Sequence, residues 1–307
     1  MGVSSGEPVG LGLDLGGSSI KYAVLVGDGA EVRIERTGLH EIVGARDAAT
    51  VSRMLGEIAS ELATEFGGSV TLGIGLPGLF DAESGVPTLL PNFPPDWVGY
   101  PLRDQVQLAT GMSVQLINDA RAFALAEARL GAARGARNAI CVVLGTGVGG
   151  GVILNGELWF GAGTGGEVGH QTVELDGPPC GCGNRGCVEA IAGSAALLAG
   201  AGRATVREVF EAARRGDAQA QAAITRSIRA VAAGLGNAYA VLAAEVFVIG
   251  GGIADAGDQV LVPLREELRS RMHLAPAETV SLRPAELGRF AGAVGAALFG
   301  ARGVALH

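Results

Sequence analysis

An apolar strand, a glycine turn and a second apolar strand follow one another twice along this chain of 307 residues. The first copy covers 9–26 around the turn GGSS, and the second covers 138–154 around the turn GTGVGG. Asp14 and Gly145, at equivalent positions near the start of each turn, lie about 130 residues apart. Because helical stretches and further strands follow each copy, the repeat predicts two similar α/β halves. Two such turns facing each other across a cleft would grip a polyphosphate with backbone N–H groups.

Hydrophobic periodicity predicts the remaining elements of both halves. Alternating apolar residues make 69–76 a strand, and strong helix formers make 120–133 a helix. Asn155 and Gly156, between two apolar runs, predict a type I′ hairpin turn. We also expect helices at 47–66, 205–243 and 289–301, and strands at 113–117 and 245–249.

Composition and charge exclude several classes of protein. The chain is 48% hydrophobic and 18% charged, which is typical of a folded protein, and its formal net charge is −8. Without a cluster of basic residues it lacks the footprint of a nucleic-acid-binding protein, so we expect no nucleic-acid partner. The start of the chain lacks a secretory signal, and the charge-free run 138–156 holds six glycines, which disfavour a membrane helix. We therefore expect a cytoplasmic protein with reduced thiols and no membrane partner.

Three of the four cysteines fall within eight residues, and a histidine stands ten positions before the first of them. Cys180, Cys182, Cys187 and His170 make a Cys₃His set, which is typical of a closed structural zinc site. Glycines at 181, 183 and 186 let the backbone wrap tightly around an ion. The alternative is a set of unrelated core cysteines, as we expect for Cys141 in its apolar strand. Glycine-rich loops seldom form cores, so the sequence favours zinc.

Two acids, Glu167 and Glu189, stand just outside the ends of this cluster. A closed four-ligand site has no open position for catalysis, so its predicted role is to hold the loop rigid. The acids that it positions would accept hydrogen bonds from the hydroxyl groups of a polyol.

Both glycine turns have features of phosphate-binding loops. Asp14 could hold Mg²⁺ through water while Ser18, Ser19 and backbone N–H groups face phosphate oxygens, although a simple hairpin turn would look the same. The turn 145–150 matches a dinucleotide-binding fingerprint, but that fingerprint requires a helix where a hairpin follows here. A Walker loop is excluded because no Gly-Lys-Ser/Thr follows. A hairpin loop with Thr146 fits phosphate binding by backbone amides and one hydroxyl.

Two further strand ends carry candidate site residues. Asp119 is a good N-cap for the helix that follows it, and it is also placed to act as a general base at a strand end. Asn118 would then orient the substrate hydroxyl that Asp119 deprotonates, and the two roles are compatible. Glycines 250–252 follow another apolar strand, and they either make a plain strand-to-helix turn or allow a nucleotide to approach the backbone.

In this order the motifs resemble those of the ROK family of sugar kinases, and the bacterial ATP-dependent glucokinases most closely. The resemblance covers nearly the whole chain, from LGLDLGGSSIK at 11–21 to the last expected helix. The motifs that carry it, in the family's order, are LPGLFD, NDARAFALAEARLGAARG, LGTGVGGGVILNGELWFGAGTGGEVGH, CGCGNRGCVEAIAGSAAL and VIGGGIADAGD. The knuckle from His170 to Cys187 is the hallmark of that family.

The resemblance implies an α/β, two-lobed, actin/hexokinase-like (ribonuclease H-like) fold with a central cleft. The smaller lobe would comprise 1–119, completed by the C-terminal helix at about 290–307. The larger lobe would comprise 120–289 with the zinc knuckle 170–187. The implied activity is transfer of the γ-phosphoryl group of ATP, with Mg²⁺, to the 6-hydroxyl of glucose, by a homodimer or homotetramer.

Site residues follow from the same resemblance. Asp119 would be the catalytic base, and His170 would bind both zinc and sugar. The implied contacts are Asn118, Glu167, His170 and Glu189 for the sugar, Gly16, Gly17, Ser18, Ser19, Gly145, Thr146 and Gly147 for phosphate, and Gly251 and Gly252 for adenosine. Pro77, Gly78 and Asn92 would line the sugar pocket.

Two departures from the family pattern leave alternatives open. Ser19 stands where the family turn usually has lysine, as in polyphosphate-using glucokinases, and Arg121 replaces a usual asparagine. N-acetylmannosamine, N-acetylglucosamine or fructose are therefore alternative acceptors, and polyphosphate is an alternative donor. A sugar-sensing repressor of the family would carry a helix-turn-helix ahead of the first strand. A regulator that had lost catalysis would not be expected to retain Asp14, Asp119 and both glycine loops.

Overall fold

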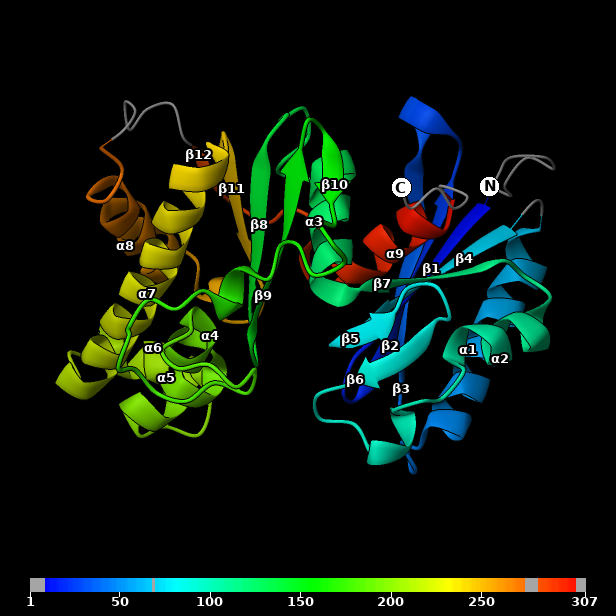
Figure 1. The fold of residues 1–307 in the computed structure, drawn as a ribbon, viewed down its shortest axis with the longest axis horizontal. Coiled ribbons are helices and arrows are strands. Elements are labelled where there is room, and N and C mark those ends of the chain that lie inside the picture. Colours follow the sequence, from blue (N-terminus) through cyan, green and yellow to red (C-terminus); the bar gives the residue numbers. More distant parts are fainter. Residues whose placement is uncertain (1–8, 68–69, 274–280, 302–307) are drawn as a thin grey trace. The chain divides into compact units, whose positions relative to one another are not determined.

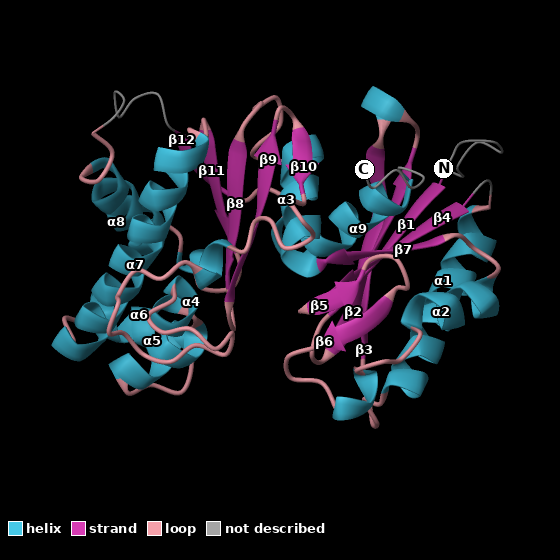
Figure 2. Ribbon diagram, in the orientation of Figure 1, coloured by secondary structure: helices cyan, strands magenta, loops and turns pink. Residues whose placement is uncertain are grey.

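The computed structural model describes residues 9–67, 70–273 and 281–301. The chain divides into two compact units, Met1–Ala126 with Arg289–His307 (unit 1) and Glu127–Gly288 (unit 2). The division falls inside helix α3 (Asp119–Leu130), between Ala126 and Glu127, whereas the expected division at 119–120 lies after the first residue of that helix. The chain returns to unit 1 through its last helix, α9 (Ala291–Ala301) (Figure 1). Both units combine helices with a twisted sheet, as Figure 2 shows.

Five strands form the sheet of unit 1, in the order β3-β2-β1-β4-β7. They are β1 (Val9–Leu15), β2 (Ser19–Val26), β3 (Arg33–Glu41), β4 (Val70–Leu76) and β7 (Val114–Asn118). β1 is antiparallel to β2 and parallel to β4, and β4 is parallel to β7. The carboxyl ends of β1, β4 and β7 therefore lie at the same edge of this sheet.

The two faces of β1 present different side chains, because alternate residues of a strand point to opposite faces. Leu11 and Leu13 are fully buried in a core that includes Val51 of helix α1 (Ala48–Phe66). Gly12 faces α9 instead, and a Cβ atom there would lie 1.9 Å from the carbonyl oxygen of Ala293. Glycine in β1 and small residues in α9 thus allow the C-terminal helix to pack directly on this sheet.

Unit 2 repeats this topology with the sheet order β10-β9-β8-β11-β12. The strands are β8 (Ala139–Leu144), β9 (Val148–Leu154), β10 (Glu157–Trp159), β11 (Val246–Gly250) and β12 (Ser281–Pro284). β8 is antiparallel to β9 and parallel to β11, as β1 is to β2 and β4, which confirms the predicted repeat. Asn155 and Gly156 have φ angles of 54° and 82°, as the predicted type I′ turn requires.

The helices of unit 2 gather on one side of its sheet (Figure 1). They are α4 (Val188–Ala192), α5 (Ser194–Ala201), α6 (Val206–Arg214), α7 (Ala218–Leu242) and α8 (Asp258–Arg269). The helical region expected at 205–243 is divided into two helices, α6 and α7, because Gly216 adopts a φ of 87° after the end of α6. Asp217 then caps α7 by accepting a hydrogen bond from the N–H of Ala220.

Shorter elements complete the described chain. Helix α2 (Leu102–Thr110) packs against α1, and β5 (Leu79–Asp81) pairs with β6 (Val86–Leu89). The 3₁₀ turns are η1 (Gly29–Glu31), η2 (Pro95–Trp97), η3 (Val168–His170), η4 (Ala254–Ala256) and η6 (Gly288–Phe290). Among the described residues, no helix combines the length and the apolar character needed to cross a membrane.

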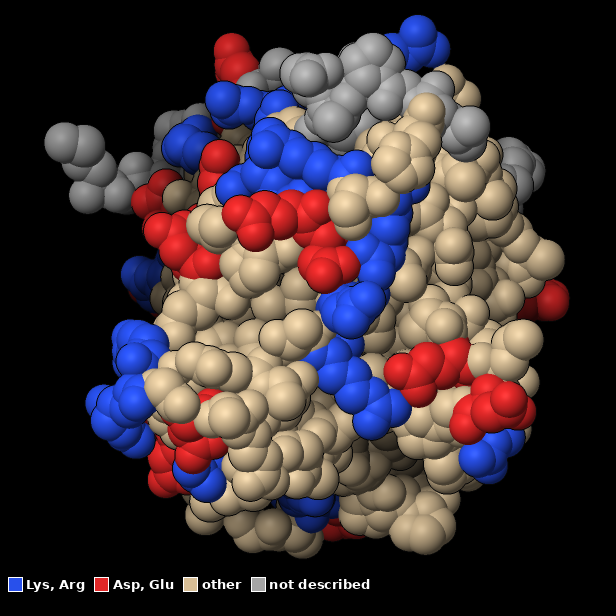
Figure 3. All heavy atoms as spheres, turned by 90° about the vertical axis from the view of Figure 1, so that its left-hand side faces the viewer, with Lys and Arg blue, Asp and Glu red and all other residues tan. Residues whose placement is uncertain are grey.

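Arginines on the outer face of unit 2, near α7 and α8, lie beside acidic side chains (Figure 3). Arg226 forms an ion pair with Glu174 at 2.9 Å, and Arg271 forms one with Glu267. With Arg229, the two arginines line an open pocket of about 480 Å³. Exposed pairs of this kind stabilise a fold little, so these ion pairs add little to the stability of unit 2.

Candidate active site

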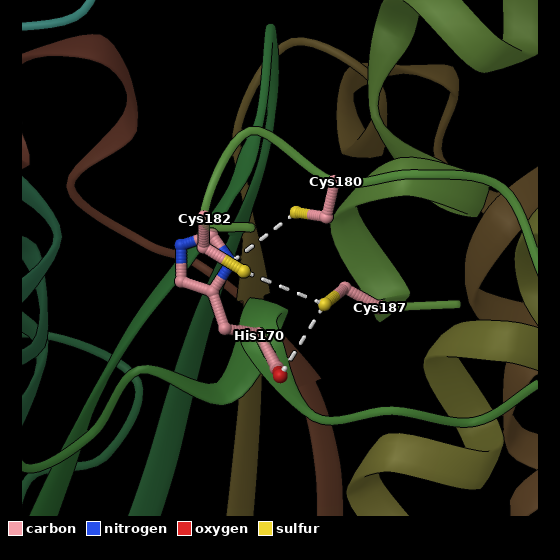
Figure 4. Close-up of side chains that lie close together, drawn as sticks. All are labelled: His170, Cys180, Cys182 and Cys187. Atoms are coloured by element: carbon pink, nitrogen blue, oxygen red, sulfur yellow. Dashed lines mark hydrogen bonds between the residues drawn. The ribbon is translucent and has the colours of Figure 1, made fainter. Parts of the chain in front are cut away.

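The four predicted zinc ligands converge in unit 2 (Figure 4). His170 Nδ1 lies 3.6 Å from Cys180 Sγ, and Cys182 Sγ lies 3.7 Å from Cys187 Sγ. All four ligand atoms lie within 4.8 Å of one another. Two sulfurs bound to one tetrahedral zinc ion at about 2.3 Å would be roughly 3.8 Å apart, so the side chains fit that ion. Cys182 is exposed, which argues against a set of core cysteines.

Glycines allow the knuckle to fold tightly enough to bring these ligands together. Gly183 and Gly186 adopt φ angles of 93° and 66°, which other residues rarely take. A Cβ atom on Gly186 would lie 1.6 Å from the carbonyl oxygen of Glu174. The N–H of Cys180 donates to the carbonyl oxygen of Asn184 at 2.8 Å, which closes the turn between the first and last cysteines.

The thiols have different proton affinities. Burial raises the pKa of Cys187 to about 12 and also raises the pKa of Cys180. A hydrogen bond from the backbone N–H of Asn184 lowers the pKa of Cys182. Metal ligands must be deprotonated, so a bound cation would offset the cost of forming the buried thiolate of Cys187.

Glu189, predicted to contact sugar, joins the knuckle to the second glycine loop. Its Oε2 accepts a hydrogen bond from the backbone N–H of Val148 at 3.0 Å. Its Oε1 lies 3.8 Å from Cys180 Sγ. A Cβ atom on Gly147 would lie 2.2 Å from Glu189 Oε2, so the carboxylate packs directly against the loop backbone.

Glu167 directly precedes the turn η3, which holds His170. The N–H of His170 donates to the carbonyl oxygen of Glu167 at 3.1 Å. A Cβ atom on Gly169 would lie 1.7 Å from the carbonyl oxygen of Val148, so this turn packs closely on β9. Because His170 and Glu189 both contact Cys180 Sγ, the structure brings these two predicted sugar contacts close together.

The two predicted nucleotide loops of unit 2 are neighbours. β8 and β11 are parallel and pair Val143 with Gly250, so both loops begin at the same sheet edge. The N–H of Ile253 donates to the carbonyl oxygen of Leu144 at 2.9 Å, and Gly251 adopts a φ of 90° next to that carbonyl. A Cβ atom on Gly252 would meet nothing within 4 Å. Ligands of α/β proteins commonly bind at this edge, beyond the carboxyl ends of parallel strands.

In unit 1, Asp14 forms an ion pair that we did not predict from the sequence. Its Oδ2 accepts a hydrogen bond from Lys21 Nζ at 3.0 Å, and its side chain is 10% exposed. Asp14 and Lys21 face each other directly across the hairpin of β1 and β2. The register of the predicted hairpin could have indicated this ion pair, because residues opposite each other in adjacent strands are in contact.

The first glycine turn is held by an arginine that sequence reasoning missed. Arg46 donates hydrogen bonds to the carbonyl oxygens of Gly17 and, at 3.2 Å, Asn92. Its own carbonyl oxygen accepts from the indole N–H of buried Trp97 at 2.9 Å. Arg46 therefore links a predicted phosphate turn to a predicted sugar-pocket residue. Nothing in the local sequence indicates this, since the partners lie 29 and 46 positions away.

The expectation that Asp119 caps α3 is wrong by one residue. Asn118 Oδ1 accepts from the N–H groups of Ala120 and Arg121, at 3.1 and 3.2 Å, which is the N-cap arrangement. Asn118 Nδ2 donates to the carbonyl oxygen of Gly78 at 3.2 Å. Asp119 is the first residue of α3 and accepts from the N–H of Ala120 at 2.7 Å. Asp119 thus stands at the carboxyl end of β7, fixed by its capping neighbour.

Residues 10–302 match the sequence model of the ROK family. The chain belongs to the ROK family. Within it, the glucokinase of Thermotoga maritima is 36% identical over 94% of this chain and 95% of its own length.

Solved structures of the ROK family share the fold. The ROK hexokinase of Thermus thermophilus is 36% identical and superposes with a TM-score of 0.85, over 95% of this chain and 98% of its own. The ROK family glucokinase of Streptomyces griseus, solved with glucose and AMPPNP, is 31% identical with a TM-score of 0.81, over 96% of this chain and 100% of its own. These likenesses confirm the predicted actin/hexokinase-like fold class.

Proposed function

We propose that this ROK protein is an ATP-dependent glucokinase, which transfers the γ-phosphoryl group of ATP to the 6-hydroxyl of glucose. The observation that carries the proposal is the nearly full-length likeness to a ROK glucokinase whose structure was solved with glucose and AMPPNP. The likeness to the Thermotoga maritima glucokinase supports the same assignment. Asp119 directly follows β7 and Gly145 directly follows β8, so both stand at the carboxyl ends of strands, where α/β proteins commonly bind ligands.

Asp119 is the proposed catalytic base. As the 6-hydroxyl oxygen attacks the γ-phosphorus, an oxygen–phosphorus bond forms, the bond to the β-phosphate oxygen breaks and ADP leaves. The hydroxyl proton passes to the Asp119 carboxylate. The cap formed by Asn118 fixes the first turn of α3 and with it the position of Asp119. Positioning of this kind supplies much of the acceleration in phosphoryl transfer.

The sugar is held, in this proposal, by Asn118, Glu167, His170 and Glu189. The last three lie around the Cys₃His knuckle, so a structural zinc ion would fix them indirectly. His170 Nδ1 faces Cys180 within the cluster, which supports a bond from Nδ1 to zinc and would leave Nε2 for the sugar. Pro77, Gly78 and Asn92 are further candidates for the wall of the sugar pocket, and Asn118 bonds directly to the carbonyl of Gly78.

The nucleotide contacts are proposed on the glycine loops. The residues are Gly16, Gly17, Ser18 and Ser19 of the first turn, Gly145, Thr146 and Gly147 of the second, and Gly251 and Gly252 for adenosine. Mg²⁺, bound with ATP, would offset negative charge on the phosphates. Asp14 offers the carboxylate oxygens that Mg²⁺ prefers, and Lys21 bonds to Oδ2 rather than to Oδ1.

A panel of hexoses crossed with phosphoryl donors tests the function. We expect glucose with ATP to give the highest kcat/KM among glucose, N-acetylmannosamine, N-acetylglucosamine and fructose, each with ATP, ADP or polyphosphate. A preference for another sugar or donor would replace the named substrate and keep the reaction class. Absence of phosphoryl transfer to every sugar would overturn the proposal. Sedimentation of the same preparation tests the proposed homodimer or homotetramer.

A further inference from the structure

The carboxylate of Glu189 contacts both the Cys₃His knuckle and the second glycine loop. Its Oε2 is bonded to the N–H of Val148, while its Oε1 lies 3.8 Å from the sulfur of Cys180. If the Glu189 side chain pointed into water, the N–H of Val148 would lose this charged acceptor. Hydrogen bonds to ionised acceptors are about twice as strong as neutral ones, so this contact orients the peptide that follows Gly147.

Helix α4 connects the two regions through the backbone as well. It begins directly after the ligand Cys187 and is followed by Gly193, whose N–H donates to the carbonyl oxygen of Glu189 at 2.9 Å. The next residue, Ser194, donates its N–H to the carbonyl oxygen of Gly145 at 2.9 Å. The two ends of the glycine loop, Gly145 and Val148, are therefore hydrogen-bonded to Ser194 and Glu189. Both of these partners closely follow the metal ligand Cys187 in the sequence.

Glycine at 147 is required for this arrangement. A Cβ atom there would lie 2.2 Å from Glu189 Oε2, which is shorter than any real contact. The carboxylate therefore packs against the loop backbone at Gly147, and a side chain at this position would displace it.

We propose that Glu189 is a positioning residue. Through it, the conformational order of the glycine loop 145–148 depends on whether the Cys₃His cluster holds a metal ion. Nucleotide affinity, and not only sugar affinity, then depends on this side chain and on the cluster. The part of the inference that concerns nucleotide rests on the proposed function, because that function assigns phosphate binding to the loop.

Hydrogen exchange at the Val148 amide tests the coupling without any substrate. We expect exchange in Glu189→Ala to accelerate about tenfold or more, because the amide loses a charged acceptor. Glu189→Gln keeps an acceptor oxygen and should retain most of the protection. Glu174→Gln is the matched control, since Glu174 also lies beside the knuckle but pairs with Arg226 at the surface. Amides of β11 (Val246–Gly250) should be unchanged in every variant, which separates loop opening from global unfolding.

Chelation of the metal provides the second arm of the experiment. Removal of the metal should accelerate Val148 exchange in the wild type and add little in Glu189→Ala, because coupled perturbations are not additive. Calorimetric titration with ADP, in the absence of sugar, should give a Kd about five- to tenfold higher for Glu189→Ala than for the wild type.

Additive effects of chelation and substitution, or wild-type exchange in Glu189→Ala, would overturn the inference. A changed exchange rate with an unchanged Kd for ADP would also overturn it as stated, because the loop would then not set nucleotide affinity. If the wild type phosphorylated no sugar but Val148 exchange still depended on Glu189 and the metal, the proposed function would fail and the coupling would stand.

Discussion

The side chain of Glu127 accepts a hydrogen bond at 3.0 Å from the backbone N–H of Leu287, which lies 160 positions later in the chain. The same carboxylate accepts from the N–H groups of Ala132, at 2.8 Å, and Glu286, at 3.1 Å. Glu127 is fully buried. It therefore joins the end of α3 to the segment through which the chain leaves unit 2.

Replacement of Glu127 should destabilise the protein. Glu127→Ala removes the shared acceptor of three backbone N–H groups, so we expect a loss of about 3 kcal/mol or more in the free energy of unfolding. Glu127→Gln should lose less, since its amide oxygen still accepts. Denaturant unfolding measures both, with Glu286→Ala as the control because it removes an exposed carboxylate and leaves its backbone N–H in place. Equal stability of Glu127→Ala and the control would contradict this role.

Purified protein should contain about one equivalent of zinc per chain, as a closed Cys₃His site requires. Cys187→Ser should lose most of that metal and unfold at a lower temperature, because metal binding contributes to folding. Cys141→Ala should keep it, since Cys141 lies buried in β8 away from the cluster. Elemental analysis of fresh, unchelated protein measures the zinc content per chain of the wild type and of both variants. A wild-type content below about half an equivalent would count against the zinc site.

Arg46→Ala should weaken ATP binding through the first glycine turn. The variant loses the hydrogen bonds to Gly17 and Asn92, so the turn is held less firmly. We expect the KM for ATP to rise about three- to tenfold, with a smaller change in kcat. Arg53→Ala is the control, because Arg53 pairs only with the nearby surface residue Glu57 in the described part of the chain. Matching kinetics for the two variants would remove Arg46 from the site.

The N-terminus of α1 should contribute a pH-dependent stabilisation. Hydrogen bonds from Thr50 hold the pKa of the capping residue Asp47 below its usual value of 3.8. A lowered folded-state pKa stabilises the fold above the unfolded-state value, and this contribution is lost as the pH falls through the folded-state pKa. Asp47→Ala should therefore be less stable than the wild type near neutral pH, with the difference shrinking below about pH 4. Urea melts across pH, with Glu57→Ala as control, would show this; a constant difference would contradict it.

Local patterns predicted most of the fold. Alternating apolar residues and glycine turns identified the central strands of both sheets, and the repeat of the two turns indicated the shared topology. The spacing of the cysteines and the histidine identified the metal ligands, because structural zinc sites use few residue types and a tetrahedral arrangement of four ligands. These features depend on neighbours in the sequence, which is why the sequence reveals them.

Contacts between distant segments could not be predicted in the same way. Asn118 and Asp119 are both good caps, and only the way in which β7 meets α3 decides that Asn118 caps the helix. The bond from Val148 to Glu189 spans 41 positions, and nothing in either segment indicates it. The pairing of Asp14 with Lys21 is different, because the hairpin register would have revealed it.

Turnover of glucose and ATP by Asp119→Ala, compared with the wild type and with the exposed control Asp104→Asn, tests the proposed function most directly. A coupled assay should show kcat falling on the order of a hundredfold or more in Asp119→Ala, while the control keeps wild-type turnover. Both variants should unfold close to the wild-type temperature, since Asn118 and not Asp119 caps α3. Near-normal turnover in Asp119→Ala would contradict the assignment of Asp119 as the base.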